Sequence, residues 1–134
     1  MEDTIIAGDR VVGFRLSYLF SDPARGDIII FRFPDDETQL YVKRVVGMPG
    51  ETVEVMDGAV YINGVLNLEV NAHVTAQPVG SYGPWTVPED CYFVMGDNRN
   101  LSYDSRFWNN TFVTREAVVG RAALRLFPNP GVLK

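Results

Sequence analysis

Two short segments of this sequence carry the residues that could do acid–base chemistry. The first, residues 41–50, contains Lys43, and the second, residues 96–106, is dense in Asp, Asn, Arg and Ser. Only two of the twelve basic residues are lysines, Lys43 and Lys134, and all the others are arginines. A lysine amine can lose its proton inside a protein, whereas an arginine guanidinium cannot. Lys43 is therefore the basic residue suited to act as a general base.

The neighbours of Lys43 predict that its amine is partly buried. Strand alternation places Tyr41, Lys43 and Val45 on one face, so the ammonium group would lie among apolar side chains. Burial disfavours the charged form of a lysine and so lowers its pKa. The alternative is an ordinary strand lysine with a solvated amine, and the alternation by itself leaves that alternative open.

The second segment predicts a hydrogen-bonded polar loop beside a buried strand. Its two aspartates, Asp97 and Asp104, can pair with arginines, and bidentate pairing would fix the loop. The candidate arginines are Arg44, Arg99 and Arg106. Such a network also fits a purely structural role. The functional alternative adds Ser102, whose hydroxyl could orient the amine of Lys43 toward a nucleophile.

Length and composition limit the class of protein. The chain has 134 residues, of which 46% are hydrophobic, and this predicts one domain over residues 1–134 with an irregular excursion at about residues 71–86. The net charge of −5 argues against a nucleic-acid partner. A lone Cys91 and one histidine form no metal site of known spacing, so we expect neither a metal nor a cofactor. Apolar runs are too short to span a bilayer, so any membrane anchor would precede Met1.

Short β-rich runs separated by turn signals predict an all-β fold of antiparallel sheets, with at most one or two short helical turns. The expected strands are 27–33, the Lys43 strand, 51–56, 59–62, 65–70, 91–95 and 121–127. Pro49-Gly50 predicts a type II turn, and Asp57-Gly58 and Asn63-Gly64 each predict a hairpin. Thr114 is expected to cap a helical turn that ends at Gly120.

Taken together, these segments resemble the type I signal peptidases, membrane-anchored Ser/Lys endopeptidases that remove signal peptides from exported proteins. Three ordered motifs carry the resemblance, which covers nearly the whole chain. They are R-G-D with an apolar run at 25–31, the lysine box at 41–51, and G-D-N-R followed by S-x-D-S-R-x-W at 96–108. Asn100 departs from the usual Asp and Leu101 from the usual Asn, but neither position carries the base or its orienting hydroxyl.

The resemblance implies a role for each candidate residue. Lys43 is similar to the general base of the family and Ser102 to the serine that positions it. The supporting network would consist of Arg44, Asp97, Arg99, Asp104 and Arg106. An extended substrate with small residues at the first and third positions before the cut would bind by strand addition. Its pockets are expected along Ile5, Ile6, Tyr41 and Val42.

The resemblance places the nucleophilic serine immediately before Met1. Residues 1–9 match the segment that comes after that serine in the family, although Asp3 stands where many members have proline. The nucleophile's own backbone N–H also contributes to the oxyanion site of the family. We therefore expect residues 1–134 alone to be inactive as a peptidase.

Membrane attachment and the partners are also implied by the resemblance. It implies signal peptides of secreted preproteins as partners, an anchor upstream of this chain, and a catalytic domain on the extracytoplasmic side of the cell membrane. An apolar rim facing the bilayer is expected, with packing into the core as the alternative. Its members would be Phe14, Leu16, Tyr18, Leu19 and Phe20.

Two rivals to a signal peptidase use the same fold. One is a non-catalytic domain that binds extended peptides, which the absence of the serine would favour. Retention of Lys43 together with Ser102 argues against it, because a binding domain has no need of a desolvated base beside an orienting hydroxyl. The other is a self-cleaving repressor-type Ser/Lys peptidase, and the G-D-N-R and R-G-D motifs favour the signal peptidases instead.

Overall fold

A computed structural model describes residues 10–14, 21–74, 77–127 and 131–132 of the chain. The described strands are β1 (Arg10–Phe14), β2 (Ile28–Phe33), β3 (Asp36–Gly47), β4 (Thr52–Met56), β5 (Ala59–Ile62), β6 (Val65–Leu66), β7 (Tyr82–Thr86), β8 (Cys91–Met95), β9 (Val113–Thr114), β10 (Val118–Phe127) and β11 (Gly131–Val132). Two short helices accompany them, α1 (Leu68–Asn71) and the 3-10 helix η2 (Arg115–Ala117). The predicted all-β class is confirmed.

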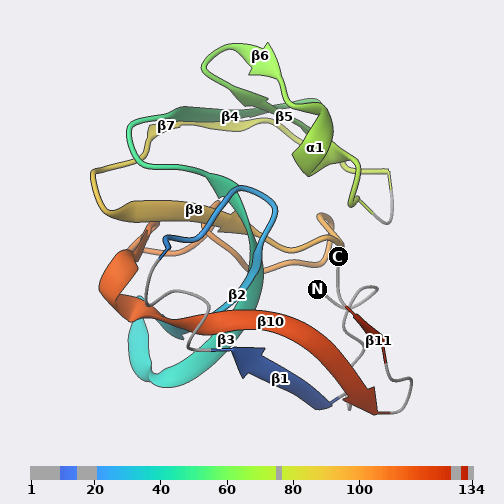
Figure 1. Cartoon of the computed structure of the whole chain (residues 1–134). Helices are drawn as coiled ribbons and strands as arrows, with labels where there is room; N and C mark the ends of the chain where they lie inside the picture. Colours follow the sequence, from blue (N-terminus) through green and yellow to red (C-terminus); the bar gives the residue numbers. More distant parts are fainter. Residues whose placement is uncertain (1–9, 15–20, 75–76, 128–130, 133–134) are drawn as a thin grey trace.

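The strands form two antiparallel sheets (Figure 1). The large sheet has the order β1-β10-β2-β3-β8-β9, with β11 also paired to β10, and the small sheet has the order β6-β5-β4-β7. The small sheet is inserted in the sequence between β3 and β8, which are neighbours in the large sheet. In Figure 1 it lies above β8, so the chain leaves the large sheet, builds the small one and returns.

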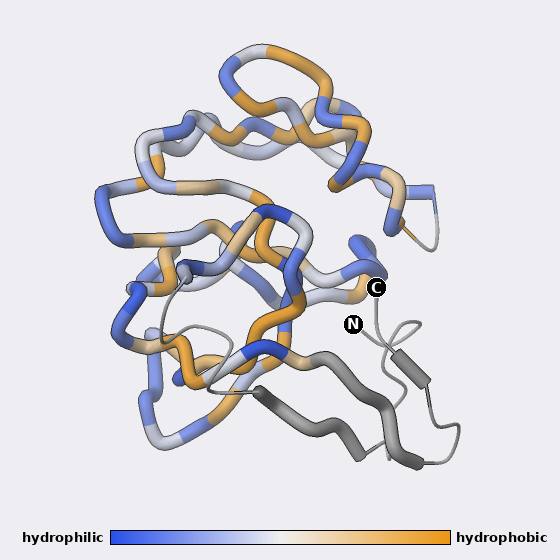
Figure 2. Tube along the Cα trace, viewed as in Figure 1, coloured by the Kyte–Doolittle hydropathy of each residue, from blue (hydrophilic) through white to orange (hydrophobic). Residues whose placement is uncertain are grey.

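The end of β3, residues 44–47, and residues 92–95 of β8 are buried and lie between two apolar cores, whereas the first residues of β3 are exposed. On one face, Val45 and Val94 join a core of the large sheet. On the other face, Val46 and Phe93 join a second core, which is shared with the small sheet. Figure 2 shows apolar residues gathered along β2 and β3. The strands β3 and β8 therefore link the large sheet to the small sheet.

The predicted turns around the small sheet are confirmed. Gly50 has a φ of 82°, and the N–H of Glu51 donates to the carbonyl of Met48 at 3.1 Å, as a type II turn requires. At the two hairpins, Asp57-Gly58 and Asn63-Gly64 each place two successive residues at positive φ. That geometry is a type I′ turn, whose twist suits antiparallel strands.

Two predicted elements around the small sheet differ from the structure. The strand expected over 65–70 is only the two-residue β6, because Asn67 begins the helix α1. The side chain of Asn67 accepts a hydrogen bond from the N–H of Val70 at 3.0 Å, which satisfies one free donor of the first turn. The excursion expected to be irregular over 71–86 ends in a regular strand, β7, which pairs with β4.

A third difference concerns the turn that follows β9. Thr114 caps it as predicted, with its hydroxyl accepting from the N–H of Ala117 at 3.3 Å. The helix is, however, a single 3-10 turn that ends at Ala117, and Gly120 does not stop it. Gly120 instead lies within β10 and pairs with Ile30 of β2.

Gly47 lies at the end of β3, between Val53 of β4 and Phe93 of β8. A Cβ atom added to Gly47 would lie 2.5 Å from the Cγ2 atom of Val53 in β4 and 2.9 Å from the Cβ atom of Phe93 in β8. Both distances are shorter than carbon atoms tolerate, and both partners are buried. The absence of a side chain at Gly47 therefore permits the small sheet to pack on β3.

We predict that Gly47→Ala lowers the free energy of unfolding by about 1–3 kcal/mol through overpacking. Urea denaturation of residues 1–134 measures this loss. Val53→Ala removes the methyl group that the new Cβ atom meets, so the double variant should lose less than the two single losses added together. Full additivity would contradict the proposed clash.

Candidate active site

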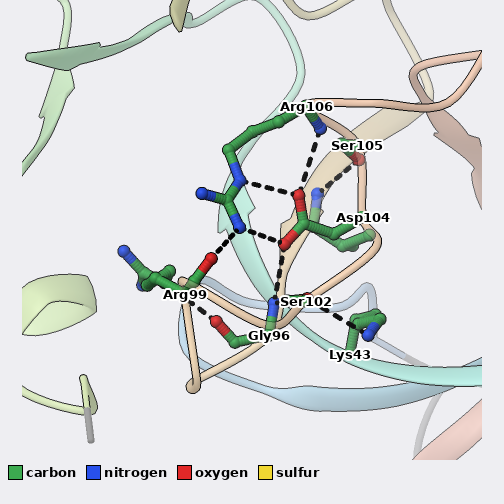
Figure 3. A network of polar contacts seen from close by, with 8 residues as sticks. Lys43, Gly96, Arg99, Ser102, Asp104, Ser105 and Arg106 are labelled. Carbon is green, nitrogen blue, oxygen red and sulfur yellow. Dashed lines mark hydrogen bonds and ion pairs between the residues drawn. The ribbon is translucent and has the colours of Figure 1, made fainter. Parts of the chain in front are cut away.

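Lys43 and Ser102, far apart in sequence, meet in the structure. The Nζ atom of Lys43 donates a hydrogen bond to the Oγ atom of Ser102 at 3.2 Å (Figure 3). Lys43 is half-buried, and its cross-strand neighbour on β2 is the buried Ile29. Tyr41 and Val45, its same-face neighbours on β3, belong to the apolar core of the large sheet. The neighbours of Lys43 on its own face of the strand are therefore Tyr41 and Val45, as the alternation predicted.

Ser102 is held in place by two donors. Besides the bond from Lys43, its hydroxyl oxygen accepts from the N–H of Gly96 at 3.1 Å, and only 8% of the residue is exposed. A hydroxyl group has two acceptor lone pairs and one donor hydrogen. Lys43 can donate an N–H hydrogen to this oxygen whether its amine is protonated or neutral, and a neutral amine then directs its lone pair away from Ser102. In either state Ser102 fixes the direction of the amine.

Asp104 and Arg106 brace the loop that carries Ser102. The carboxylate of Asp104 accepts from the N–H of Gly96 at 3.2 Å and from Nε and Nη2 of Arg106 at 2.8 and 2.9 Å. Nη2 of Arg106 also donates to the carbonyl of Arg99 at 2.8 Å, which closes the loop on itself (Figure 3). The backbone N–H of Gly96 therefore donates to both the hydroxyl of Ser102 and the carboxylate of Asp104.

Arg44 and Asp97 form a second pair on the opposite side of β3 from Lys43. Nε and Nη2 of Arg44 donate to the two carboxylate oxygens of Asp97, each at 2.8 Å, and both side chains are almost fully buried. Nη1 of Arg44 donates to the carbonyl of Gly26 at 2.9 Å, in the R-G-D motif. This bidentate pair joins β3 to the start of the polar loop.

Arg99 is buried inside the same loop. Its Nε atom donates to the carbonyl of Gly96 at 2.9 Å and its Nη2 atom to the carbonyl of Val70 in α1 at 3.0 Å. Its Nη1 atom has no hydrogen-bond partner within the described ranges. Burial, together with the charge of Arg106, lowers the pKa of Arg99 to about 10. Each of the five residues of the expected network thus makes a hydrogen bond to the polar loop at 96–106 or within it.

Two supporting features were not predicted from the sequence. Ser105 is fully buried, and its Oγ atom accepts from the N–H of Val94 at 2.9 Å while its own N–H donates to the Val94 carbonyl. Arg25 donates through Nη1 and Nη2 to the carboxylate of Glu51 at 2.6 and 2.7 Å. Ser105 lies inside the motif at 96–108 and Arg25 inside the motif at 25–31, so their places in these motifs were the signal that could have identified them.

The expected substrate pockets are described only in part. Ile5 and Ile6 lie outside the described residues. Tyr41 and Val42 lie on opposite faces of β3: the ring of Tyr41 stacks on Phe33 with centroids 4.2 Å apart, and Val42 packs against Ile28. Of the expected apolar rim, Phe14 ends β1, and Leu16, Tyr18, Leu19 and Phe20 lie outside the described residues.

Comparison with known proteins identifies the family. A family model described as "Signal peptidase, peptidase S26" matches residues 1–127. The chain belongs to this signal peptidase family. This signal peptidase domain is 44% identical, over 98% of its length, to the "Probable signal peptidase I-2" of a Synechocystis species, and 43% identical, over 96%, to the "Signal peptidase I" of Leptolyngbya laminosa.

A solved structure of a signal peptidase I from Enterococcus faecalis V583 has a similar fold. It is 38% identical and covers 75% of this signal peptidase domain and 97% of its own chain, with a TM-score of 0.60. The chain spans 61% and 64% of the lengths of the two relatives named above. None of the helices within the described ranges is long and apolar enough to cross a membrane.

We predict that Asp97→Leu lowers the free energy of unfolding by about 3–5 kcal/mol, because it leaves the Arg44 guanidinium buried without its carboxylate. Chemical denaturation at neutral pH measures the loss. The matched control is the double variant Arg44→Met/Asp97→Leu, which removes both charges and should be more stable than Asp97→Leu alone. A double variant less stable than the single one would contradict a buried-charge penalty.

A second prediction concerns Glu51, which accepts from Arg25 and from the N–H of Met48. Burial raises the pKa of Glu51, but the hydrogen bonds from Arg25 and Met48 and the charge of Arg25 outweigh it, and the pKa is lowered. A folded-state pKa below the ordinary value of 4.5 stabilises the fold above that pH, and the stabilisation is lost as the pH falls through the folded-state pKa.

Glu51→Gln should therefore cost about 1 kcal/mol of unfolding free energy at neutral pH and nothing in strong acid. Denaturation curves of both proteins at the two pH values measure the difference. Glu37→Gln is the control, because Glu37 is an exposed carboxylate at the start of β3. A loss for Glu51→Gln that does not change with pH would contradict the assignment.

Proposed function

We propose that residues 1–134 form a single signal-peptidase catalytic domain, a serine endopeptidase domain that removes signal peptides from exported preproteins after small-x-small sites. The observation that carries this proposal is the hydrogen bond from Lys43 to Ser102, made between two motifs of a chain that belongs to the signal peptidase family. Relatives that carry the printed name signal peptidase I support it.

In the proposed mechanism, a serine immediately ahead of Met1 attacks the carbonyl carbon of the scissile peptide bond. Neutral Lys43 accepts the proton of that serine and later passes it to the leaving amine. The acyl-enzyme that forms is then hydrolysed by water. Ser102 keeps the lone pair of Lys43 directed at the nucleophile, which is the part of an orienting group in a catalytic triad.

The remaining residues support this geometry without touching the reacting atoms. The Arg44–Asp97 pair holds β3 against the start of the loop, and Asp104 holds the Gly96 amide that anchors Ser102. Placement of this kind matters because a displacement of about 1 Å can cost roughly a hundredfold in rate. The buried pairs are thus proposed to act by keeping Ser102 within reach of Lys43.

Substrate and location complete the proposal. An extended signal peptide would bind by strand addition, with its small side chains in pockets lined by Ile5, Ile6, Tyr41 and Val42. The domain would lie on the extracytoplasmic side of the cell membrane, attached through a segment ahead of Met1. The preprotein is proposed as the partner, and neither a metal nor a nucleic acid takes part.

The test extends the chain at its N-terminus by the serine-bearing segment and measures cleavage of a peptide with an Ala-x-Ala site. We expect cleavage that Lys43→Ala abolishes and that Ser102→Ala lowers by roughly a hundredfold or more, because the base loses its orienting group. Residues 1–134 without the serine are the inactive control. Binding of the peptide without cleavage by the extended chain would reject the enzyme in favour of a peptide-binding domain.

A further inference from the structure

The segment that leads into β7 of the small sheet contacts the Ser102 loop at one end through Asn100. The Nδ2 atom of Asn100 donates to the carbonyl of Gln77 at 2.8 Å, and its Oδ1 atom accepts from the N–H of Val79 at 3.2 Å. An amide can do both, whereas a carboxylate has only acceptor atoms. Asn100, which departs from the usual Asp of the family, therefore pairs with the segment that leads into β7.

At its other end the loop contacts β7 through Arg106. The guanidinium carbon of Arg106 lies 4.9 Å from the centroid of the Phe107 ring and 5.7 Å from that of Tyr82, in cation–π range. The rings of Tyr82 and Phe107 themselves meet edge to face, with centroids 5.3 Å apart and an interplanar angle of 86°. Tyr82 is the residue that the small sheet contributes to this cluster.

These two contacts lie on either side of Ser102. Leu101, before Ser102, is 76% exposed, and Tyr103, after it, is 51% exposed, with its ring in edge contact with Phe33 and Trp108. Arg106 holds the carboxylate of Asp104, which shares the Gly96 amide with Ser102. A path of contacts therefore runs from the ring of Tyr82 through Arg106, Asp104 and the N–H of Gly96 to the hydroxyl of Ser102, which contacts Lys43.

We propose that Tyr82 and Asn100 are positioning residues, through which the small sheet fixes the Ser102 loop against Lys43. Neither residue touches the amine, and each acts on it only through the loop. The inference rests on the proposed function for its catalytic meaning, but the positioning itself can be measured without any cleavage. Loss of either contact should loosen Ser102; Asn100 is exposed and can be changed without altering either core, whereas Tyr82 also packs against the core shared with the small sheet.

The first measurement follows the Lys43 amine directly in residues 1–134 labelled with ¹³C-lysine. Because the chain has only two lysines, the spectrum has one Cε signal for Lys43 and one for Lys134 as an internal reference. We expect Tyr82→Leu and Asn100→Asp to shift the Lys43 signal at constant pH. Tyr82→Phe keeps the ring and should restore the original signal.

The matched control is Tyr61→Leu, the same substitution at a half-buried tyrosine of β5 in the same sheet. It removes a ring of the same size and should leave the Lys43 signal unchanged. Asn100 is exposed, so Asn100→Asp is expected to fold even where Tyr82→Leu does not. An unshifted Lys43 signal in Asn100→Asp and in a folded Tyr82→Leu would overturn the proposal.

The second measurement uses the serine-bearing chain and the Ala-x-Ala peptide. Tyr82→Leu should lower kcat by roughly tenfold or more with KM within about twofold, since the substrate pockets are untouched and only the base is displaced. A change confined to KM would overturn the positioning role. If the unsubstituted serine-bearing chain cleaves nothing, the proposed function fails, whereas the Lys43 signal still decides the positioning.

Discussion

Two adjacent basic residues of β3, Lys43 and Arg44, connect this strand to one loop, and the site depends on both connections. Because side chains of a strand alternate between its faces, Lys43 and Arg44 point to opposite sides of β3. Both donate hydrogen bonds to residues of a single loop, Lys43 to Ser102 and Arg44 to Asp97. The loop must therefore contact both faces of one strand, and neither contact can move without disturbing the other.

The buried pair and the half-buried amine have different chemical requirements. Arg44 is fully paired, which is the condition under which a permanent charge is tolerated in a core. Lys43 lies beside the apolar Ile29 and donates to the neutral hydroxyl of Ser102. On one face of the strand a buried guanidinium is paired with a carboxylate, and on the other an amine donates to a neutral hydroxyl.

The residues that meet at the site were easier to predict from the sequence than the architecture of the small sheet. The residues of the Lys43–Ser102 site could be named because their types, order and spacing are specific, and the turns at Gly50 and Gly64 because only certain residues adopt positive φ. The helix α1 was missed, since a capping residue such as Asn67 is equally typical of a turn. The contacts of Tyr82 and Gln77 with the loop could not be predicted, because ring faces and backbone carbonyls leave no signature in a sequence.

The insertion of the small sheet between β3 and β8 is closed at its base. The N–H of Gly50 donates to the carbonyl of Val87, and the N–H of Val87 donates to the carbonyl of Glu51, both at 2.8 Å. The two ends of the insertion therefore meet beside the strands that they leave and rejoin. The entropy of closing a loop rises only slowly with its length. Residues added or removed at the outer hairpin near Gly64 should therefore leave the spacing of β3 and β8 unchanged.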